Sequence, residues 1–122
     1  MRLLLDTNSF IQWHAGKLRP AAVRTVRRAE LVAVSAITAW EIAIKRAVGK
    51  LRMDDLVEDV VARNAFVALP VTVRHGDLLR SLPLHHPDPF DRLLIVQALD
   101  EGLTILTSDR AFEPYRVPVE WV

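Results

Sequence analysis

The chain has 122 residues, 51% of them hydrophobic and 25% charged, which is enough to form one domain with its own core. It has no cysteine, which excludes disulfides and thiolate metal sites, and no apolar run approaches the roughly 20 residues that span a membrane. The net charge of +1 combines a basic half, residues 1–52, with an acidic half, residues 53–122. This asymmetry hints at an anionic partner, and solvated helix faces explain it equally well.

The first residues carry further information on location. Their apolar run is short and ends at Asp6, which is not typical of a signal peptide. We therefore expect a soluble, cytoplasmic protein with a single domain over residues 1–122.

Short apolar segments alternate with amphipathic ones along the chain. In chain order, the expected elements are strand 2–6, helix 7–14, turn 16–19, helix 20–30, strand 31–35, helix 37–48, helix 54–64, strand 66–69, helix 72–82, loop 84–89, helix 90–101, strand 103–107, a short helical turn and strand 119–122. This alternation predicts an α/β fold with a parallel sheet covered on both faces. Ligands of such folds bind beyond the carboxyl ends of the strands.

Four acidic residues, Asp6, Glu41, Asp91 and Asp109, stand where such a fold can bring them to one place. Asp6 and Asp109 follow expected strands, and Asp91 opens an expected helix. Glu41 lies on the apolar stripe of another helix, formed by Ile37, Trp40, Ile44 and Val48. A cluster of acids with no nearby Lys is what a hard cation such as Mg²⁺ needs, because Mg²⁺ takes oxygen ligands and keeps several waters. The pattern first indicates a metal-dependent enzyme acting on phosphate esters.

Each acid also has a purely structural interpretation. Asp6 suits a helix N-cap, and Asp109 suits a turn or cap. Asp91 can be the third residue of a helix capped by Asp88, next to Pro89. Glu41 can pair on the surface with Lys45, one helical turn on. These interpretations stay open beside the functional one, and Asp88 is assigned mainly to capping.

Other polar residues carry weaker signals. His85 and His86 lie in a Pro-rich loop and are expected to be solvent-exposed rather than ligands. Basic residues near 17–28 and 45–52, among them Lys45, Arg46 and Lys50, are candidates to hold a nucleic-acid backbone.

Four ordered segments resemble a known family. They are Leu-Leu-Leu-Asp-Thr-Asn at 3–8, Ser-Ala-Ile-Thr-Ala-Trp-Glu-Ile at 35–42, His-Pro-Asp-Pro-Phe-Asp-Arg-Leu-Leu at 86–94 followed by Gln97-Ala98, and Leu-Thr-Ser-Asp-Arg-Ala-Phe at 106–112 followed by Tyr115. Together they resemble PIN-domain ribonucleases, and among these the VapC-like toxins of bacterial and archaeal toxin–antitoxin pairs. The resemblance spans the whole chain.

The resemblance implies roles for named residues. Asp6, Glu41, Asp91 and Asp109 match the family's catalytic and metal-binding acids, and Thr7, Asn8 and Thr107 would support them. It implies a three-layer α/β/α fold with strand order 3-2-1-4-5. It also implies a homodimer, Mg²⁺ or Mn²⁺, cleavage of RNA to 5′-phosphate and 3′-hydroxyl ends, and an antitoxin whose C-terminal segment covers the active site.

Three other functions are alternatives to a toxin ribonuclease. A phosphoryl-accepting receiver domain needs a Lys after a late strand, and this chain has no Lys beyond Lys50. A non-catalytic PIN-like binding module is disfavoured by the intact set of four acids. A housekeeping PIN-type RNA-processing nuclease without an antitoxin stays open.

Overall fold

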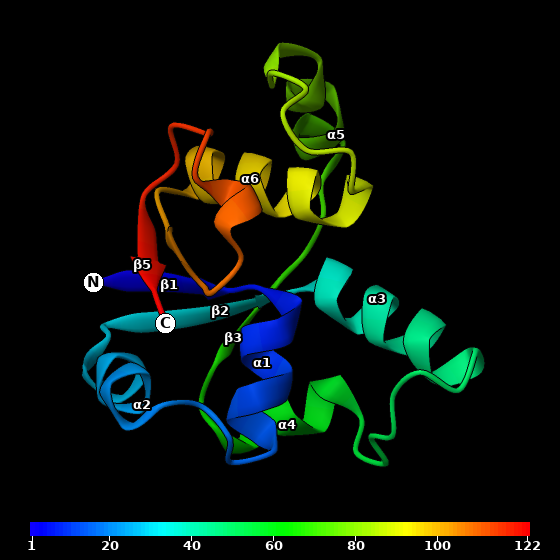
Figure 1. The fold of residues 1–122 in the computed structure, drawn as a ribbon, viewed down its shortest axis with the longest axis vertical. Coiled ribbons are helices and arrows are strands. Elements are labelled where there is room, and N and C mark those ends of the chain that lie inside the picture. The colour runs from blue at the N-terminus through cyan, green and yellow to red at the C-terminus, as the bar shows by residue number, and fades with distance from the viewer.

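A computed structural model describes all residues 1–122 and shows a five-stranded parallel sheet with helices on both faces (Figure 1). The strands are β1 (Arg2–Leu5), β2 (Leu31–Ser35), β3 (Val67–Leu69), β4 (Thr104–Thr107) and β5 (Val119–Trp121). The helices are α1 (Thr7–His14), α2 (Pro20–Arg28), α3 (Ala36–Ala47), α4 (Val57–Arg63), α5 (Val73–Leu78) and α6 (Pro89–Glu101), with 3₁₀ turns at η1 (Leu79–Ser81) and η2 (Arg110–Phe112). The predicted α/β class is confirmed.

The central strand β1 divides the core into two layers. Successive side chains of a strand point to opposite faces, so Leu3 and Leu5 pack on one side of the sheet and Leu4 packs on the other. All three side chains are fully buried. The first layer includes residues of α1, α2 and α4, and the second includes residues of α6 and of the segment after β4. Burial on both faces explains why these strands have apolar runs without polar alternation.

The strand order is β3-β2-β1-β4-β5, as the family resemblance implied. This order makes β1 and β4 neighbours, with Leu4 opposite Ile105 and Leu5 opposite Leu106. Asp6 and Asp109 follow the carboxyl ends of these two strands. The sheet therefore brings together acids that are about a hundred residues apart in the sequence.

Two predicted helices differ from the observed ones. α4 begins at Val57 rather than residue 54, because Met53 is buried in the core and the chain reaches α4 through an irregular segment over 54–56. The helix predicted over 72–82 ends earlier, at Leu78, and continues as the 3₁₀ turn η1. The remaining boundaries agree within about two residues, and Gly102 ends α6 with a left-handed backbone, φ +67°.

The apolar stripe predicted on α3 is only partly buried, and this prediction was wrong. Ile37 belongs to the core, whereas Trp40 is 59% exposed and Ile44 and Val48 are also exposed. The helix instead buries Ile37, Thr38 and Ile42. In Figure 1, α3 leaves the end of the sheet and extends away from it, so the rest of the fold covers only part of its surface. None of the helices is long and apolar enough to cross a membrane.

Candidate active site

One pocket collects all four acids that the sequence singled out. It has a volume of about 380 Å³ and no hydrophobic residue in its lining. The lining residues are Asp6, Thr7, Asn8, Glu41, Lys45, Asp88, Asp91, Ser108 and Asp109. They come from the start of α1, the middle of α3, the start of α6 and the segment after β4. The pocket lies at the carboxyl ends of the strands, where α/β folds bind their ligands.

Asp6 is both a helix cap and a pocket residue. It is only 5% exposed. Its Oδ1 accepts a hydrogen bond from the Ser9 backbone amide at 2.8 Å, which makes it the N-cap of α1. Its Oδ2 accepts from the hydroxyl of Thr107 on β4. Partners that follow β1 and end β4 therefore hold the Asp6 carboxylate together, and they fix its orientation.

Glu41 reaches the pocket from α3 and is held by two partners. The Thr7 hydroxyl donates to Oε1 at 2.8 Å, and Lys45 Nζ lies 3.1 Å from Oε2. Thr7 also shares a 3.1 Å hydrogen bond with Thr38, which packs α1 against α3. The prediction that no Lys lies near the acids was wrong, because the i, i+4 spacing brings Lys45 into the same lining. The expected Glu41–Lys45 pair is present, and Glu41 also lines the pocket.

Asp91 lies in the first turn of α6, whose start is set by Asp88 and Pro89. Asp88 accepts from the backbone amides of Phe90 at 2.8 Å and of Asp91 at 3.3 Å, so its predicted capping role is confirmed. The Asp91 carboxylate does not close a capping box with Asp88. Its Oδ2 instead lies 2.9 Å from Nε2 of His86.

His86 is a residue whose contact sequence reasoning missed. Its side chain is 17% exposed, against the expectation of a solvent-exposed loop histidine. Loop residues follow no periodicity, so no pattern in the sequence could show which way this side chain points. The available signals were the five-residue separation from Asp91 across a helix start and the place of His86 at the beginning of the family-like segment 86–94.

Asp109 completes the set from the turn after β4. Its Oδ1 accepts from the Ala111 backbone amide at 2.9 Å, which makes it the N-cap of η2. Its own amide donates to the Thr107 hydroxyl oxygen at 3.0 Å. Thr107 thus contacts both Asp6 and Asp109, and Thr7 and Asn8 line the pocket. The three predicted supporting residues all lie at the site.

Burial gives two of these carboxyls an unusual proton affinity. Burial raises the pKa of Asp6, although hydrogen bonds from Thr107 and Ser9 act in the opposite direction. Burial also raises the pKa of Asp91 to about 6, and the hydrogen bond from His86 opposes this shift. The negative charge of Asp109 adds to the rise at Asp6, and that of Asp6 adds to the rise at Asp91. The negative charges of neighbouring acids therefore contribute to the raised pKa of Asp6 and to that of Asp91.

The donor set fits a hard divalent cation. Carboxylate oxygens face a polar pocket without thiols, and mutual repulsion and burial raise the proton affinity of two of them. A divalent cation would relieve that repulsion. Asp6, Glu41, Asp91 and Asp109 are the residues that would hold it. His86, Asp88 and Asp91 also lie close enough together for each to offer one atom to a cation.

The predicted nucleic-acid-binding residues divide into two groups. Lys45 lines the acidic pocket and pairs with Glu41. Arg46 lines a different pocket, of about 250 Å³, between α3 and the start of α4. Lys50 is exposed beyond the end of α3 and lines neither pocket. Only Lys45 is therefore placed beside the acids.

A second cluster of titratable groups, between α5 and α6, has a structural explanation. His75 is fully buried, and its Nδ1 accepts from the Thr72 backbone amide at 3.0 Å, which closes a capping box at the start of α5. Its Nε2 lies 3.3 Å from Glu101 and 3.4 Å from Asp100. Both ring nitrogens are thus engaged, and the cluster ties α5 to α6.

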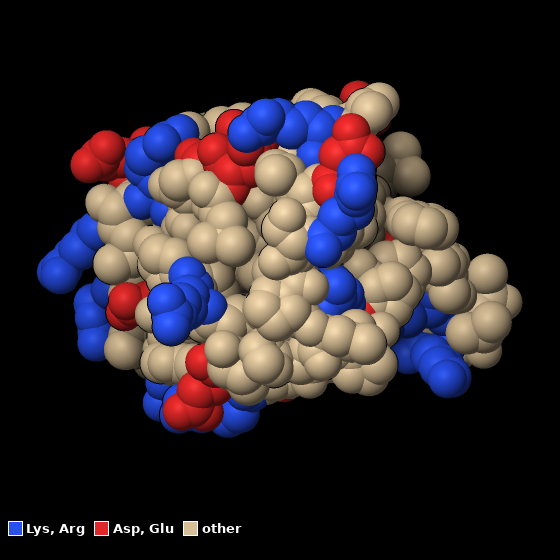
Figure 2. Space-filling view, turned by 90° about the horizontal axis from the view of Figure 1, so that it is seen from above, with Lys and Arg blue, Asp and Glu red and all other residues tan.

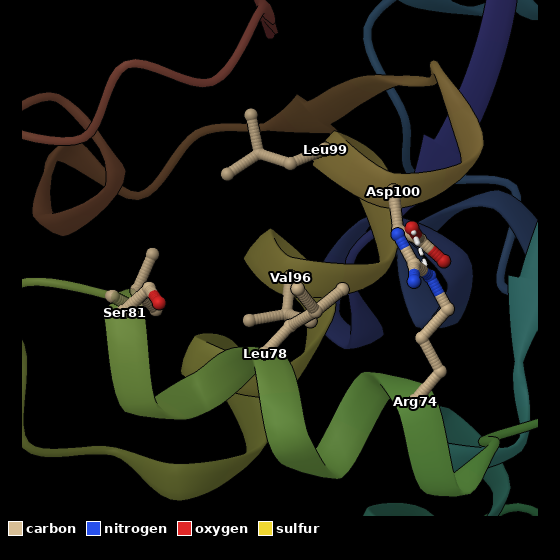
Figure 3. Close-up of a pocket in the computed structure, with 7 residues that line it drawn as sticks. Arg74, Leu78, Ser81, Val96, Leu99 and Asp100 are labelled. Carbon is tan, nitrogen blue, oxygen red and sulfur yellow. Dashed lines mark hydrogen bonds and ion pairs between the residues drawn. The ribbon is translucent and has the colours of Figure 1, made fainter.

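A shallow apolar pocket lies beside that cluster (Figure 3). Leu78 of α5 and Val96 and Leu99 of α6 line it, and the Arg74–Asp100 ion pair closes one side. Its volume is about 260 Å³. Seen from above, this end of the molecule has uncharged areas with Lys, Arg, Asp and Glu side chains among and around them (Figure 2). The pocket contains none of the four acids, so it is separate from the candidate active site.

Comparison with known proteins agrees with this architecture. A search of curated proteins found no significant match. Solved structures with the same fold include VapBC2 from Rickettsia felis bound to a promoter DNA fragment, with a TM-score of 0.76, 14% identity and coverage of 98% of each chain. DNA-bound VapBC from Salmonella typhimurium has a TM-score of 0.71, 21% identity and coverage of 98% of this chain and 97% of that one. FitAcB from Neisseria gonorrhoeae has a TM-score of 0.66, 22% identity and coverage of 96% and 95%.

At these identities the solved structures show a shared fold, and the family follows from the sequence itself. The model of the PIN domain, a family of nucleases, matches residues 3–117, which is nearly the whole chain and includes all four pocket acids. The chain belongs to the PIN domain family.

Proposed function

We propose that this protein is a Mg²⁺- or Mn²⁺-dependent endoribonuclease that acts as the toxin of a toxin–antitoxin pair. One observation carries the proposal: Asp6, Glu41, Asp91 and Asp109 line one polar pocket at the carboxyl ends of the strands. Each is held by a hydrogen-bonding partner, so the pocket is ordered before any ligand arrives. Preorganised charge of this kind stabilises a transition state without further rearrangement.

The chain's own residues divide the work of phosphodiester hydrolysis. The four carboxylates would hold the cation, and Thr7 and Thr107 would keep Glu41 and Asp6 in place. A bound divalent cation supplies an activated water and neutralises developing charge on the phosphate. Lys45, 3.1 Å from Glu41, is the one basic residue in the pocket lining and could contact a phosphate there. We expect 5′-phosphate and 3′-hydroxyl ends, because water would attack the phosphorus and the 3′ oxygen would leave, while the RNA 2′-hydroxyl takes no part as nucleophile.

RNA selectivity must then come from binding rather than from the reaction. Basic residues of the first half of the chain, including Arg46 and Lys50 beyond the pocket, would contact the phosphate backbone. Such contacts are electrostatic and weaken with salt. The cleavage site within the RNA would depend on bases that contact other parts of the surface.

The toxin assignment rests on the neighbours and on an exposed helix face. The solved structures with this fold include toxin–antitoxin complexes. Beside the pocket, α3 exposes Trp40 and Ile44, and Val48, the residue that follows the helix, is exposed as well. A C-terminal segment of an antitoxin would cover such a face, and a homodimer partner would cover other apolar surface. A housekeeping RNA-processing nuclease of the same family has no use for an inhibitor. A small reading frame next to the gene, encoding a DNA-binding partner, distinguishes the two.

Purified protein tests the enzymatic part of this proposal. We expect it to cut RNA in Mg²⁺ or Mn²⁺ and to stop when EDTA is added. Asp6→Asn and Asp91→Asn should each lower the rate at least about a hundredfold, because each removes a ligand charge. Asp59→Asn, an exposed acid on α4 outside the pocket, is the matched control and should keep the parent rate. Equal activity of Asp91→Asn and Asp59→Asn would remove the pocket from the reaction.

A further inference from the structure

Asp91 differs from the other pocket acids in the kind of partner that holds it. Backbone amides, hydroxyls or Lys45 hold Asp6, Glu41 and Asp109, whereas the ring of His86 contacts Asp91. The contact joins His86 Nε2 to Asp91 Oδ2 at 2.9 Å, and both side chains are mostly buried. An ionised carboxylate can only accept hydrogen bonds, so Nε2 carries the proton and donates it to this bond. The other oxygen, Oδ1, has no hydrogen-bond partner in the protein.

The loop that carries His86 is itself fixed. The backbone amides of His85 and His86 donate to the hydroxyl of Tyr115 at 3.1 and 2.9 Å. Arg92, in the second turn of α6, donates to the same hydroxyl at 3.2 Å and to the carbonyls of Leu82 and Pro83. Tyr115 is 6% exposed. Hydrogen bonds to Tyr115 in the core and to Arg92 on α6 thus hold the loop that places the His86 imidazole next to Asp91.

We infer that His86 is a positioning residue of the cation site, holding one oxygen of Asp91 so that the other faces the pocket. The inference rests on the proposed function, because it assigns Asp91 to the cation. A carboxylate that can rotate freely binds a cation more weakly, because binding fixes its orientation and costs conformational entropy. A hydrogen-bond partner on the far side of the carboxylate fixes that orientation beforehand and so reduces the cost. While Nε2 donates to Asp91, that nitrogen cannot also bind a cation, so through this contact His86 acts on Asp91 and not as a ligand.

The neighbouring His85 provides a matched control. It lies in the same loop, and its ring packs edge-to-face on Tyr115 at 5.1 Å. Its side chain contacts no carboxylate of the pocket. A substitution there perturbs the same loop and removes the same kind of ring. His85 is more exposed than His86, and only His86 donates a hydrogen bond to a pocket acid.

The test is the affinity for Mn²⁺ alone, measured by calorimetry and by electron paramagnetic resonance without RNA. His86→Ala should weaken Mn²⁺ binding about 10- to 100-fold, the usual effect of removing a group behind a metal ligand. His86→Gln should bind within about threefold of the parent, because its amide places a donor near the position of Nε2. His86→Asn, one methylene shorter, should lose the contact and resemble His86→Ala. His85→Ala should bind like the parent.

A kinetic measurement adds a second readout. With the His86→Ala variant, more Mn²⁺ should be needed for half-maximal cleavage, while the KM for RNA at saturating Mn²⁺ stays at the parent value. Thermal unfolding of each variant without metal shows whether it is folded. If His86→Ala does not fold, the pair His86→Gln and His86→Asn carries the comparison.

The outcomes separate this inference from the proposed function. Equal Mn²⁺ affinity of His86→Ala and His85→Ala, with the parent binding Mn²⁺, overturns the inference and leaves the function standing. A ¹⁴N coupling from imidazole in the Mn²⁺ spectrum overturns it differently, because His86 would then be a ligand. A parent that binds no Mn²⁺ removes the proposed function, and the inference with it.

Discussion

At the scale of single residues, three of the pocket acids serve the backbone as well as the site. Asp6 and Asp109 are N-caps, and Asp91 lies in the first turn of a helix. The predicted capping roles of Asp6 and Asp109 are confirmed, and Asp91 is the third residue of its helix as expected, although it forms no capping box with Asp88. Sequence reasoning could name the acids because they follow strands and open helices. It could not find the His86 contact, because that contact depends on how a loop meets the start of α6. The pairing of Lys45 with Glu41 followed from their i, i+4 spacing.

Asp91 should reduce the stability of the metal-free protein. Its folded pKa of about 6 lies above the usual value of 3.8, so between these pH values the folded state binds the extra proton. Stability thus falls as pH rises through this window, and the full cost, on the order of 3 kcal/mol for a pKa raised from 3.8 to about 6, is present above pH 6. Asp91→Asn should therefore raise the unfolding temperature at pH 7.5 in EDTA and lose the stabilisation that Mn²⁺ gives the parent. A lower unfolding temperature in EDTA would contradict this account.

Lys45 should compete with the cation for Glu41. Its ammonium lies 3.1 Å from Oε2 and lines the same pocket, so its charge partly neutralises the site before metal binds. Lys45→Met should therefore tighten Mn²⁺ binding severalfold in calorimetry without RNA. Arg46→Met, on the same helix but outside the pocket, is the control and should change it less. Weaker Mn²⁺ binding by Lys45→Met would show that the lysine organises the site instead.

At the scale of elements, the helix ends marked by Pro or Gly were predicted well, and the irregular segments were not. Pro20, Gly49 and Gly102 stand close to the observed ends of their helices. The predicted helices that correspond to α4 and α5 are too long. The residues before α4 and after α5 have helical propensity, but tertiary packing gives them another conformation. On α3 the apolar periodicity identified the helix correctly and its buried face wrongly. Periodicity does not show how much of a helix the rest of the fold covers.

The end of α6 offers a test of element stability. Gly102 adopts φ +67°, a conformation that costs an L-residue roughly 1 kcal/mol, although a Cβ there would meet only Arg2 at 3.9 Å. Gly102→Ala should thus lower the free energy of unfolding by about that amount in urea denaturation. Gly76→Ala, within α5 and with open space around it, should be neutral or slightly stabilising. Equal effects of the two substitutions would contradict the backbone explanation.

At the scale of the whole molecule, the alternation of strands and helices indicated a parallel sheet. The order of its strands is a different matter, since periodicity says nothing about which strands are neighbours. That order came from the family resemblance, and the structure confirms it. It places β1 beside β4 and so turns a list of separate acids into one pocket.

The growth of bacterial cells that express this protein tests the proposal that it is a toxin. Expression of the parent chain alone should arrest growth, and Glu41→Gln should relieve the arrest, because the amide keeps the shape of the side chain and loses its charge. The hydrogen bond from Thr7 can persist, so the variant should still fold. Circular dichroism and expression level are the controls. Undiminished toxicity of Glu41→Gln would make Glu41 a structural residue.

A cognate antitoxin should exploit the charge of the pocket. Four carboxylates with one lysine among the lining residues would attract an Arg or Lys from the partner, bidentate if it is Arg. Replacing that side chain with Ala should weaken inhibition of RNA cleavage more than it weakens binding, because apolar contacts remain. A complex that leaves Asp6 and Asp91 open, with RNA still cut, would refute this mode of inhibition.

The central claim is that the four acids form one cation site that hydrolyses RNA by attack of water. The most direct measurement is the chemistry of the RNA ends made by purified protein in Mn²⁺, with an EDTA-treated sample alongside. The account predicts 5′-phosphate and 3′-hydroxyl ends and no products in EDTA. Products with 5′-hydroxyl and 2′,3′-cyclic phosphate ends, or the same cleavage in EDTA, would contradict it.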